Sequence, residues 1–325
     1  MGRLREARPV IVVAIVTGLA LLAWAPSRFV GGAAELAERW RVSPVLIGAL
    51  VIGLGTSAPE MLVSGLAALH GDPAVGAGNI VGSNIANLGL ILGIAGLVGS
   101  VRVTDRTLRT EVPLVAAATV AFALAVQGGV SVGEGLALLT GLAGALAVIV
   151  RRSRGAGTAG TDLEEDVEDF LAHEPRRSTG RLIAALAVGL GGIIGGAQAL
   201  VWGAIEVADA LDLSGGFVGM TLVAVGTSIP ELVTAVAAVR AGEDELVVGN
   251  VLGSNLFNCL AVGAVVGLAG AGSLDDTTLT TGGVGLMLGV TAVATGALAI
   301  GGRVTRLEAA GLLVTYLVVM PLLGR

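Results

Sequence analysis

The sequence predicts an all-α polytopic membrane protein with about ten transmembrane helices, arranged as two inverted five-helix repeats with broken motif helices. Hydrophobic residues make up 54% of the 325 residues and charged residues only 14%, with a mean hydropathy of +0.89. A soluble domain usually carries about 25% charged residues. Two further observations are the long apolar stretches that recur from end to end and a polar motif that occurs twice.

Ten apolar stretches are expected to cross the bilayer. They cover residues 10–26, 43–69, 73–99, 111–127, 131–150, 181–202, 214–240, 245–270, 281–301 and 307–323. One long polar segment, residues 151–180, interrupts them. We therefore predict a first transmembrane repeat at 1–150, a linker at 151–180 and a second, inverted repeat at 181–325.

Small residues and the lone cysteine fit a membrane bundle. Glycine accounts for 52 residues, and small residues let helices approach one another closely in lipid. One cysteine, Cys259, excludes a disulfide within the chain and is expected to pack in an apolar run. We expect contact with the lipid bilayer, no nucleic-acid partner and no cofactor, and the sequence identifies no protein partner.

Arginine placement predicts the orientation, since cytoplasmic loops are enriched in basic residues. The loops after odd-numbered spans, linker included, hold 15 of the 19 arginines, and the loops after even-numbered spans hold none. The linker is therefore expected to be cytoplasmic and both termini outside, in a cell or inner membrane. Arg3, Arg5 and Arg8 argue against this orientation for the first span alone.

The N-terminus also resembles a cleavable signal peptide, because those arginines precede an apolar run that ends in Ala23-Trp24-Ala25. Internal similarity argues that the first span is retained. Residues from Val30 onward match residues from Val201 onward, and the second stretch is too far along the chain to be a signal peptide. Glu35 and Glu206 match in this register and are expected near the membrane interfaces.

A polar motif is duplicated at an offset of 171 residues. Its first string is GTSAPE at 55–60 and GTSIPE at 226–231, and its second is GNIVGSNIAN at 78–87 and GNVLGSNLFN at 249–258. We call residues 55–87 the first copy and residues 226–258 the second copy. Because the copies begin five spans apart, the second should enter the bilayer from the opposite side, an arrangement found in secondary transporters with a site near the midplane.

Each copy carries one glutamate, Glu60 or Glu231, inside apolar sequence. A carboxylate within a membrane helix is costly unless it meets a cation, a proton or a partner. Two of them supply up to four oxygens and a charge of −2, which suits a hard divalent cation or more than one monovalent ion. Hydroxyls at the preceding positions share the helix face with each glutamate. They are Thr56 and Ser57 in the first copy and Thr227 and Ser228 in the second.

Proline should open each motif helix. Pro59 and Pro230 lack an N–H, and the ring clashes with the carbonyl four residues earlier, at Gly55 or Gly226. Non-helical backbone is tolerated at membrane depth where it lines a cavity. The freed carbonyls therefore become candidate ligands.

The second string of the motif forms a polar stripe, since its side chains recur every four residues. The stripe holds Asn79, Ser83 and Asn87 in the first copy and Asn250, Ser254 and Asn258 in the second. Beside it, Gly78, Gly82, Gly249 and Gly253 should let these helices pack close to the broken ones. Alone, such a stripe could serve only to pack helices together, and a lone glutamate could be a structural hydrogen-bonding group. Duplication of both in register favours an ion site, and the oxygen-only ligands disfavour zinc and copper.

These residues resemble the calcium/cation antiporter superfamily, and within it the prokaryotic type of sodium/calcium exchanger. The resemblance is strongest over 53–97 and 224–268. It implies that Glu60 and Glu231 coordinate calcium and compete for sodium. It also implies hydroxyl or carbonyl ligands at Thr56, Ser57, Ser83, Thr227, Ser228 and Ser254, and an amide ligand at Asn87. Some relatives have an aspartate at the position of Asn258, so this chain lacks one possible charge and need not share their potassium dependence.

The predicted function is secondary active exchange of Ca²⁺ for Na⁺ by alternating access at a midplane site, without enzymatic activity. The nearest alternative is a proton/calcium exchanger in which both glutamates cycle through protonation. The hydroxyl and amide oxygens around each glutamate favour sodium. A cation channel is disfavoured by the inverted duplication, and a non-transporting scaffold is disfavoured by the buried acids.

Overall fold

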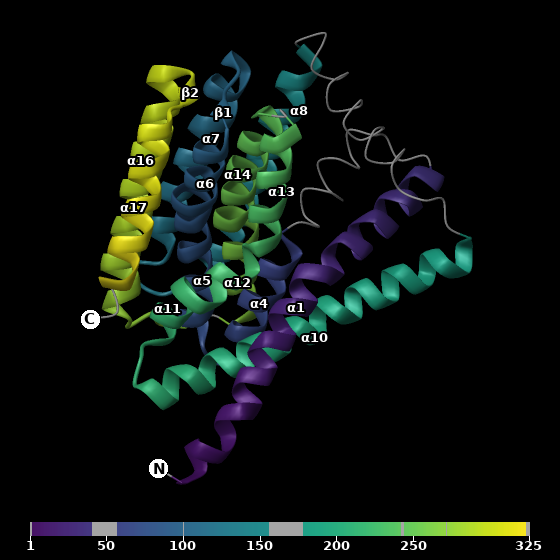
Figure 1. Cartoon of the computed structure of the whole chain (residues 1–325), viewed down its shortest axis with the longest axis vertical. Coiled ribbons are helices and arrows are strands. Elements are labelled where there is room, and N and C mark those ends of the chain that lie inside the picture. The colour runs from purple at the N-terminus through teal and green to yellow at the C-terminus, as the bar shows by residue number, and fades with distance from the viewer. Residues whose placement is uncertain are drawn as a thin grey trace.

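The computed structural model describes residues 2–40, 57–99, 101–155, 178–241, 244–270 and 272–322. Almost all of them are helical (Figure 1), which confirms the expected all-α fold. Thr56 and most of the 151–180 linker lie outside the described residues, so the predictions made for them stay predictions.

The first half of the chain contains six α-helices and one π-helical segment among the described residues. They are α1 (Gly2–Arg39), α4 (Ala58–Leu69), α5 (Pro73–Ile85), η2 (Ala86–Ile91), α6 (Leu92–Val98), α7 (Asp105–Ala125) and α8 (Val132–Gly155). In α5, η2 and α6 the helical path is continuous from Pro73 to Val98, and only its hydrogen-bond pattern changes at η2.

The second half repeats this order in the described residues. Its described elements are α10 (Thr179–Leu211), α11 (Gly215–Val218), η3 (Gly219–Val223), α12 (Ala224–Thr227), α13 (Ile229–Ala241), α14 (Asp244–Phe257), η4 (Asn258–Val262), α15 (Gly263–Ala269), η5 (Thr278–Gly283), α16 (Val284–Gly301) and α17 (Arg306–Leu322). Shifting the first half by 171 residues places α1 on α10, α4 on α13, and the run α5–η2–α6 on α14–η4–α15.

Short backbone pairings join the two halves. Strand β1 (Val101–Arg102) pairs antiparallel with β2 (Arg303–Val304), at the upper end of the bundle in Figure 1. A second, isolated bridge links Val130 to Gly272 through two N–H to carbonyl bonds of 3.1 Å. These contacts connect segments that follow transmembrane helices.

Seven helices among the described residues are long and apolar enough to cross a bilayer, and the bent run α11–α13 makes an eighth. The expected span at 43–69 begins outside the described residues and contributes α4, which has 12 residues. The C-terminal helix α17 has 17 residues. A multi-pass helical membrane protein is therefore confirmed, and the count of ten spans stays a prediction.

The predicted loop after the first span is wrong over most of its length. Helix α1 continues from Gly2 through Pro26 to Arg39. A proline removes one intrahelical hydrogen bond, and neighbouring packing can outweigh that loss. Here α1 packs along α10, and the two long helices cross the rest of the bundle obliquely in Figure 1. Arg28 adds a local contact, with its guanidinium carbon 4.0 Å from the centre of the Trp24 ring.

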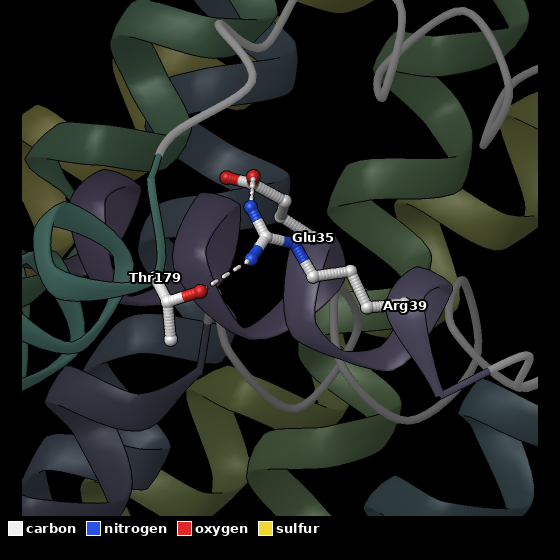
Figure 2. Close-up of polar contacts among 3 residues, drawn as sticks. All are labelled: Glu35, Arg39 and Thr179. Carbon is white, nitrogen blue, oxygen red and sulfur yellow. Dashed lines mark hydrogen bonds and ion pairs between the residues drawn. The ribbon is translucent and has the colours of Figure 1, made fainter.

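A polar contact ties the end of α1 to the start of α10 (Figure 2). Arg39 Nη2 lies 2.7 Å from Glu35 Oε1, and Arg39 Nη1 donates to Thr179 Oγ1 at 3.4 Å. The Glu35 residue is only 4% exposed. Its carboxylate is therefore neutralised by a partner on its own helix.

Burial separates two kinds of helix. The apolar windows of Pro73–Val98 and Leu246–Ala269 are 83% buried, whereas those of α1 and α10 are 28% buried. The motif helices thus form the centre of the bundle, and α1 and α10 lie at its side, with most of their surface facing outward. The duplicated polar motif therefore lies in the most deeply buried helices of the protein.

Candidate ion-binding site

Glu60 and Glu231 occupy equivalent places at the start of two helices. Each lies in the first turn of its helix, α4 or α13, where the helix dipole favours a negative charge. The residues are 2% and 4% exposed. Their carboxyl groups are near enough to interact electrostatically, so the two acids lie at one buried place.

The helix break predicted from proline is present in the second copy and has a matching backbone in the first. Helix α12 ends at Thr227 and α13 begins at Ile229, with a bend of 43° over this run. Ser228, between them, has φ −87° and ψ 5°, and Ser57 has φ −87° and ψ 7°. Pro230 cannot donate to the Gly226 carbonyl, so that oxygen loses its usual helical partner.

Close backbone packing brings the first copy against the segment that leads into the second copy. A side-chain carbon at Gly78 would collide with the Gly216 carbonyl oxygen, and one at Gly82 would collide with that of Met220. Only glycine permits this contact between α5 and the segment α11–η3. In the second copy, the segment equivalent to Gly216 and Met220 falls within 41–56, outside the described residues, so the packing of Gly249 and Gly253 is not described. The predicted close packing is therefore confirmed for the glycines of the first copy.

Nine buried side-chain oxygen or nitrogen atoms lack a hydrogen-bond partner in the described part of the chain. Six are oxygens that form three equivalent pairs between the copies, and every one belongs to a residue predicted for the ion site. They are Ser57 Oγ with Ser228 Oγ, Glu60 Oε2 with Glu231 Oε2, and Asn87 Oδ1 with Asn258 Oδ1. Because a buried polar atom without a partner destabilises a protein by about 1–3 kcal/mol, these six equivalent oxygens are candidate ligands for a bound ion.

The chemistry of these oxygens fits a hard cation. Two carboxylate, two hydroxyl and two amide oxygens offer six ligands of the type preferred by Ca²⁺, which takes six to eight. Among the described residues, neither glutamate forms an ion pair with an arginine. No group of three or more His, Cys, Asp or Glu side chains in the described part of the chain could hold a metal ion, so the candidate site combines two acids with neutral oxygens.

Three further predicted residues, Ser83, Thr227 and Ser254, are buried. Thr227 reaches across to the first copy, where its hydroxyl donates to Oδ1 of Asn79 at 3.2 Å and lies near the Glu60 carboxyl group. Thr56 lies outside the described residues.

Two π-helical turns, which sequence reasoning did not predict, hold the amides. Asn87 lies in η2 and Asn258 begins η4. A π-turn inserts one residue into a helix and is frequent at functional sites. The insertion shifts the helical register after Ile85 and Phe257, so residues beyond the turn face directions that a regular 3.6-residue period would not give.

Two residues that support the Asn87 amide, Asn255 and Asn84, were also missed. Asn87 Nδ2 donates to Asn255 Oδ1 at 2.9 Å, and Asn255 Nδ2 donates to the Asn84 carbonyl at 3.3 Å. Because the amide nitrogen of Asn87 donates to Asn255, the amide oxygen of Asn87 faces away from Asn255 and is available as a candidate ion ligand. Both residues stand within the repeated string GSN, which was the available signal.

Comparison with known proteins identifies the family. The pattern of the family described as "Sodium/calcium exchanger protein" matches residues 10–151 and 181–323. Inner membrane protein YrbG of Escherichia coli is 36% identical over 264 residues, covering 80% of each chain. Sodium/calcium exchanger MaX1 of Methanosarcina acetivorans is 28% identical over 285 residues, covering 78% of this chain and 81% of the relative.

Solved structures agree with the sequence relatives. The sodium-calcium exchanger NCX_Mj, soaked with Na⁺ and Ca²⁺, is 27% identical and superposes with a TM-score of 0.63, over 96% of this chain and 98% of that chain. The resemblance inferred from the duplicated motif is thus confirmed. The chain belongs to the sodium/calcium exchanger protein family, a family of transporters rather than enzymes.

Proposed function

We propose that this protein is a secondary active antiporter that exchanges Ca²⁺ for Na⁺ at one site shared by the two motif copies. The observation that carries the proposal is the set of six unpaired buried oxygens, which come in three equivalent pairs. Family membership supports exchange of calcium against another cation. The choice of sodium rests on the neutral hydroxyl and amide oxygens, which can ligate Na⁺ beside the glutamates without any proton transfer.

Coupling follows from the charge of the site. One Ca²⁺ neutralises the two carboxylates, and so do Na⁺ ions spread over neighbouring oxygens. An empty site leaves Glu60 and Glu231 uncompensated in a low-dielectric region, which disfavours crossing without ions. If more than two Na⁺ move for each Ca²⁺, transport carries net charge and responds to the membrane potential.

Alternating access uses two halves of opposite orientation, residues 1–150 and 181–325, joined by the 151–180 linker. Support comes from the order of elements, which repeats after 171 residues, and inverted halves can exchange roles to open one site to either side. Helices α1 and α10 are suited to move as a pair, since they pack along each other and are less buried than the motif helices. We place the protein in the cell or inner membrane, with the linker cytoplasmic and both termini outside.

Ion flux in proteoliposomes tests this function. Calcium uptake is measured in vesicles loaded with Na⁺, with K⁺, or with an imposed pH gradient. The proposal expects uptake only with internal Na⁺. Uptake that follows the pH gradient and ignores Na⁺ would establish proton exchange instead, and uptake without any counter-ion would indicate a channel.

A further inference from the structure

Asn79 links both motif copies from a fully buried position in α5. Its Nδ2 donates to Ser64 Oγ of α4 at 2.9 Å. Its Oδ1 accepts from Ser83 Oγ at 3.4 Å and from Thr227 Oγ1 at 3.2 Å. Ser83 belongs to the first copy and Thr227 to the second, and both are candidate ion ligands.

A hydroxyl has one proton and two lone pairs. It can ligate a cation only when its proton points elsewhere. One amide oxygen, that of Asn79, receives the protons of both Ser83 and Thr227, which leaves the hydroxyl lone pairs free for an ion. Ser64 fixes the direction of the amide, because a carboxamide whose nitrogen faces Ser64 must present its oxygen to the other side.

We propose that Asn79, oriented by Ser64, is a positioning residue that holds the hydroxyl oxygens of Ser83 and Thr227 toward the transported cation. Without Asn79, the Thr227 proton has two other acceptors, the Glu60 carboxylate and the Ala224 carbonyl at 3.4 Å. Donation to Glu60 would occupy a carboxylate oxygen, and donation to either acceptor would turn the hydroxyl lone pairs in another direction. Loss of Asn79 therefore weakens more than one ligand, and this inference rests on the proposed ion exchange.

The second copy lacks the equivalent support, which provides an internal control. The 171-residue offset places Asn250 at the position of Asn79 and Ala235 at the position of Ser64. Ala235 is buried and has no hydroxyl, and the buried Nδ2 of Asn250 has no partner among the described residues. The fold thus already tolerates an alanine and an unpaired asparagine nitrogen at this place in one half.

The test measures the Ca²⁺ concentration that gives half-maximal Na⁺-dependent uptake in proteoliposomes. Asn79→Leu, which removes the acceptor and keeps the side-chain size, should raise this concentration about tenfold. Ser64→Ala should raise it about threefold, since the acceptor remains but its orientation is lost. Ala235→Ser, the matched change in the second copy, should leave it within about twofold of the wild type.

A double-mutant comparison separates positioning from general packing. In a Ser83→Ala/Thr227→Val background, where no hydroxyl remains to be positioned, Asn79→Leu should add less than about twofold. The inference is overturned if Asn79→Leu raises the half-maximal Ca²⁺ concentration a full tenfold in that background. It is also overturned if Asn79→Leu alone leaves uptake unchanged, or if Ala235→Ser and Ser64→Ala have equal effects. If Asn79→Leu does not fold, Ser64→Ala carries the same test. Wild-type protein without Na⁺-dependent uptake would refute the proposed function instead, whatever the variants do.

Discussion

The two copies of the motif offer the same ligand atoms and hold them differently. Each leaves a hydroxyl, a carboxylate and an amide oxygen buried and unpaired. In the first copy, Asn87 is held by Asn255. The equivalent bond from Asn258 to Asn84 is not formed, since Asn84 Oδ1 has no partner among the described residues.

This difference shows what duplication does and does not fix. Equivalent residues give equivalent chemistry, but their hydrogen bonds differ between the two copies. The proposed alternating access would require such asymmetry, because symmetric contacts would make both sides open or closed together. Under that proposal, the hydrogen bonds that differ between the copies should change when the site opens to the other side.

The largest effect is expected when either glutamate loses its charge. Glu60→Gln and Glu231→Gln should each reduce Na⁺-dependent Ca²⁺ uptake at least about 100-fold, because a divalent ion is left with one carboxylate. The two variants should act alike. Glu35→Gln is the matched control, since Glu35 is buried but pairs with Arg39 (Figure 2), and it should retain uptake within about threefold. Full exchange in either site variant would refute the assignment.

Adding a charge tests whether the amides face the same ion. Asn87→Asp and Asn258→Asp should each lower the Ca²⁺ concentration for half-maximal uptake about tenfold, because a third carboxylate attracts a divalent cation more strongly than an amide does. The measurement is uptake against external Ca²⁺ at fixed internal Na⁺. Tighter binding in only one of the two variants would mean that the amides serve different ions.

A smaller and unequal effect is expected for the residues behind the amides. Asn255→Ala removes the bond that orients Asn87 and should weaken Ca²⁺ uptake about fivefold. Asn84→Ala should change it less than about twofold, because the Asn84 side chain holds no ligand in this conformation and its carbonyl remains. The comparison is made on the same uptake curve. Equal effects would show that the asymmetry between the copies has no bearing on binding.

The smallest effect concerns stability. Ala235→Ser should stabilise the protein by about 0.5–1.5 kcal/mol by giving the Asn250 nitrogen a partner. Ser64→Ala should destabilise it by about 1–3 kcal/mol by leaving the Asn79 nitrogen unsatisfied. Thermal unfolding of the detergent-solubilised protein checks the signs. A destabilising Ala235→Ser would mean that the second copy has no space at this position.

The sequence was sufficient for the class of fold, and the residues that it predicts for the ion site stay a prediction. Hydropathy predicted membrane helices, Pro230 predicted the break near Ser228, and the repeat identified both glutamates. The π-turns at Asn87 and Asn258 were not predictable, because a single inserted residue leaves no trace in composition or apolar period. The continuation of α1 beyond Pro26 was also missed, since its contact with α10 is tertiary. The Asn79–Ser64 bond depends on two helices meeting, which local patterns do not encode.

The central claim is that both copies contribute to one site. Equilibrium binding of radioactive Ca²⁺ to the purified protein, with and without competing Na⁺, tests it most directly. We expect one Ca²⁺ per chain at saturation, displaced by Na⁺, and lost in both Glu60→Gln and Glu231→Gln. Two Ca²⁺ per chain, with each variant keeping one, would contradict it, because each glutamate would then belong to a separate site.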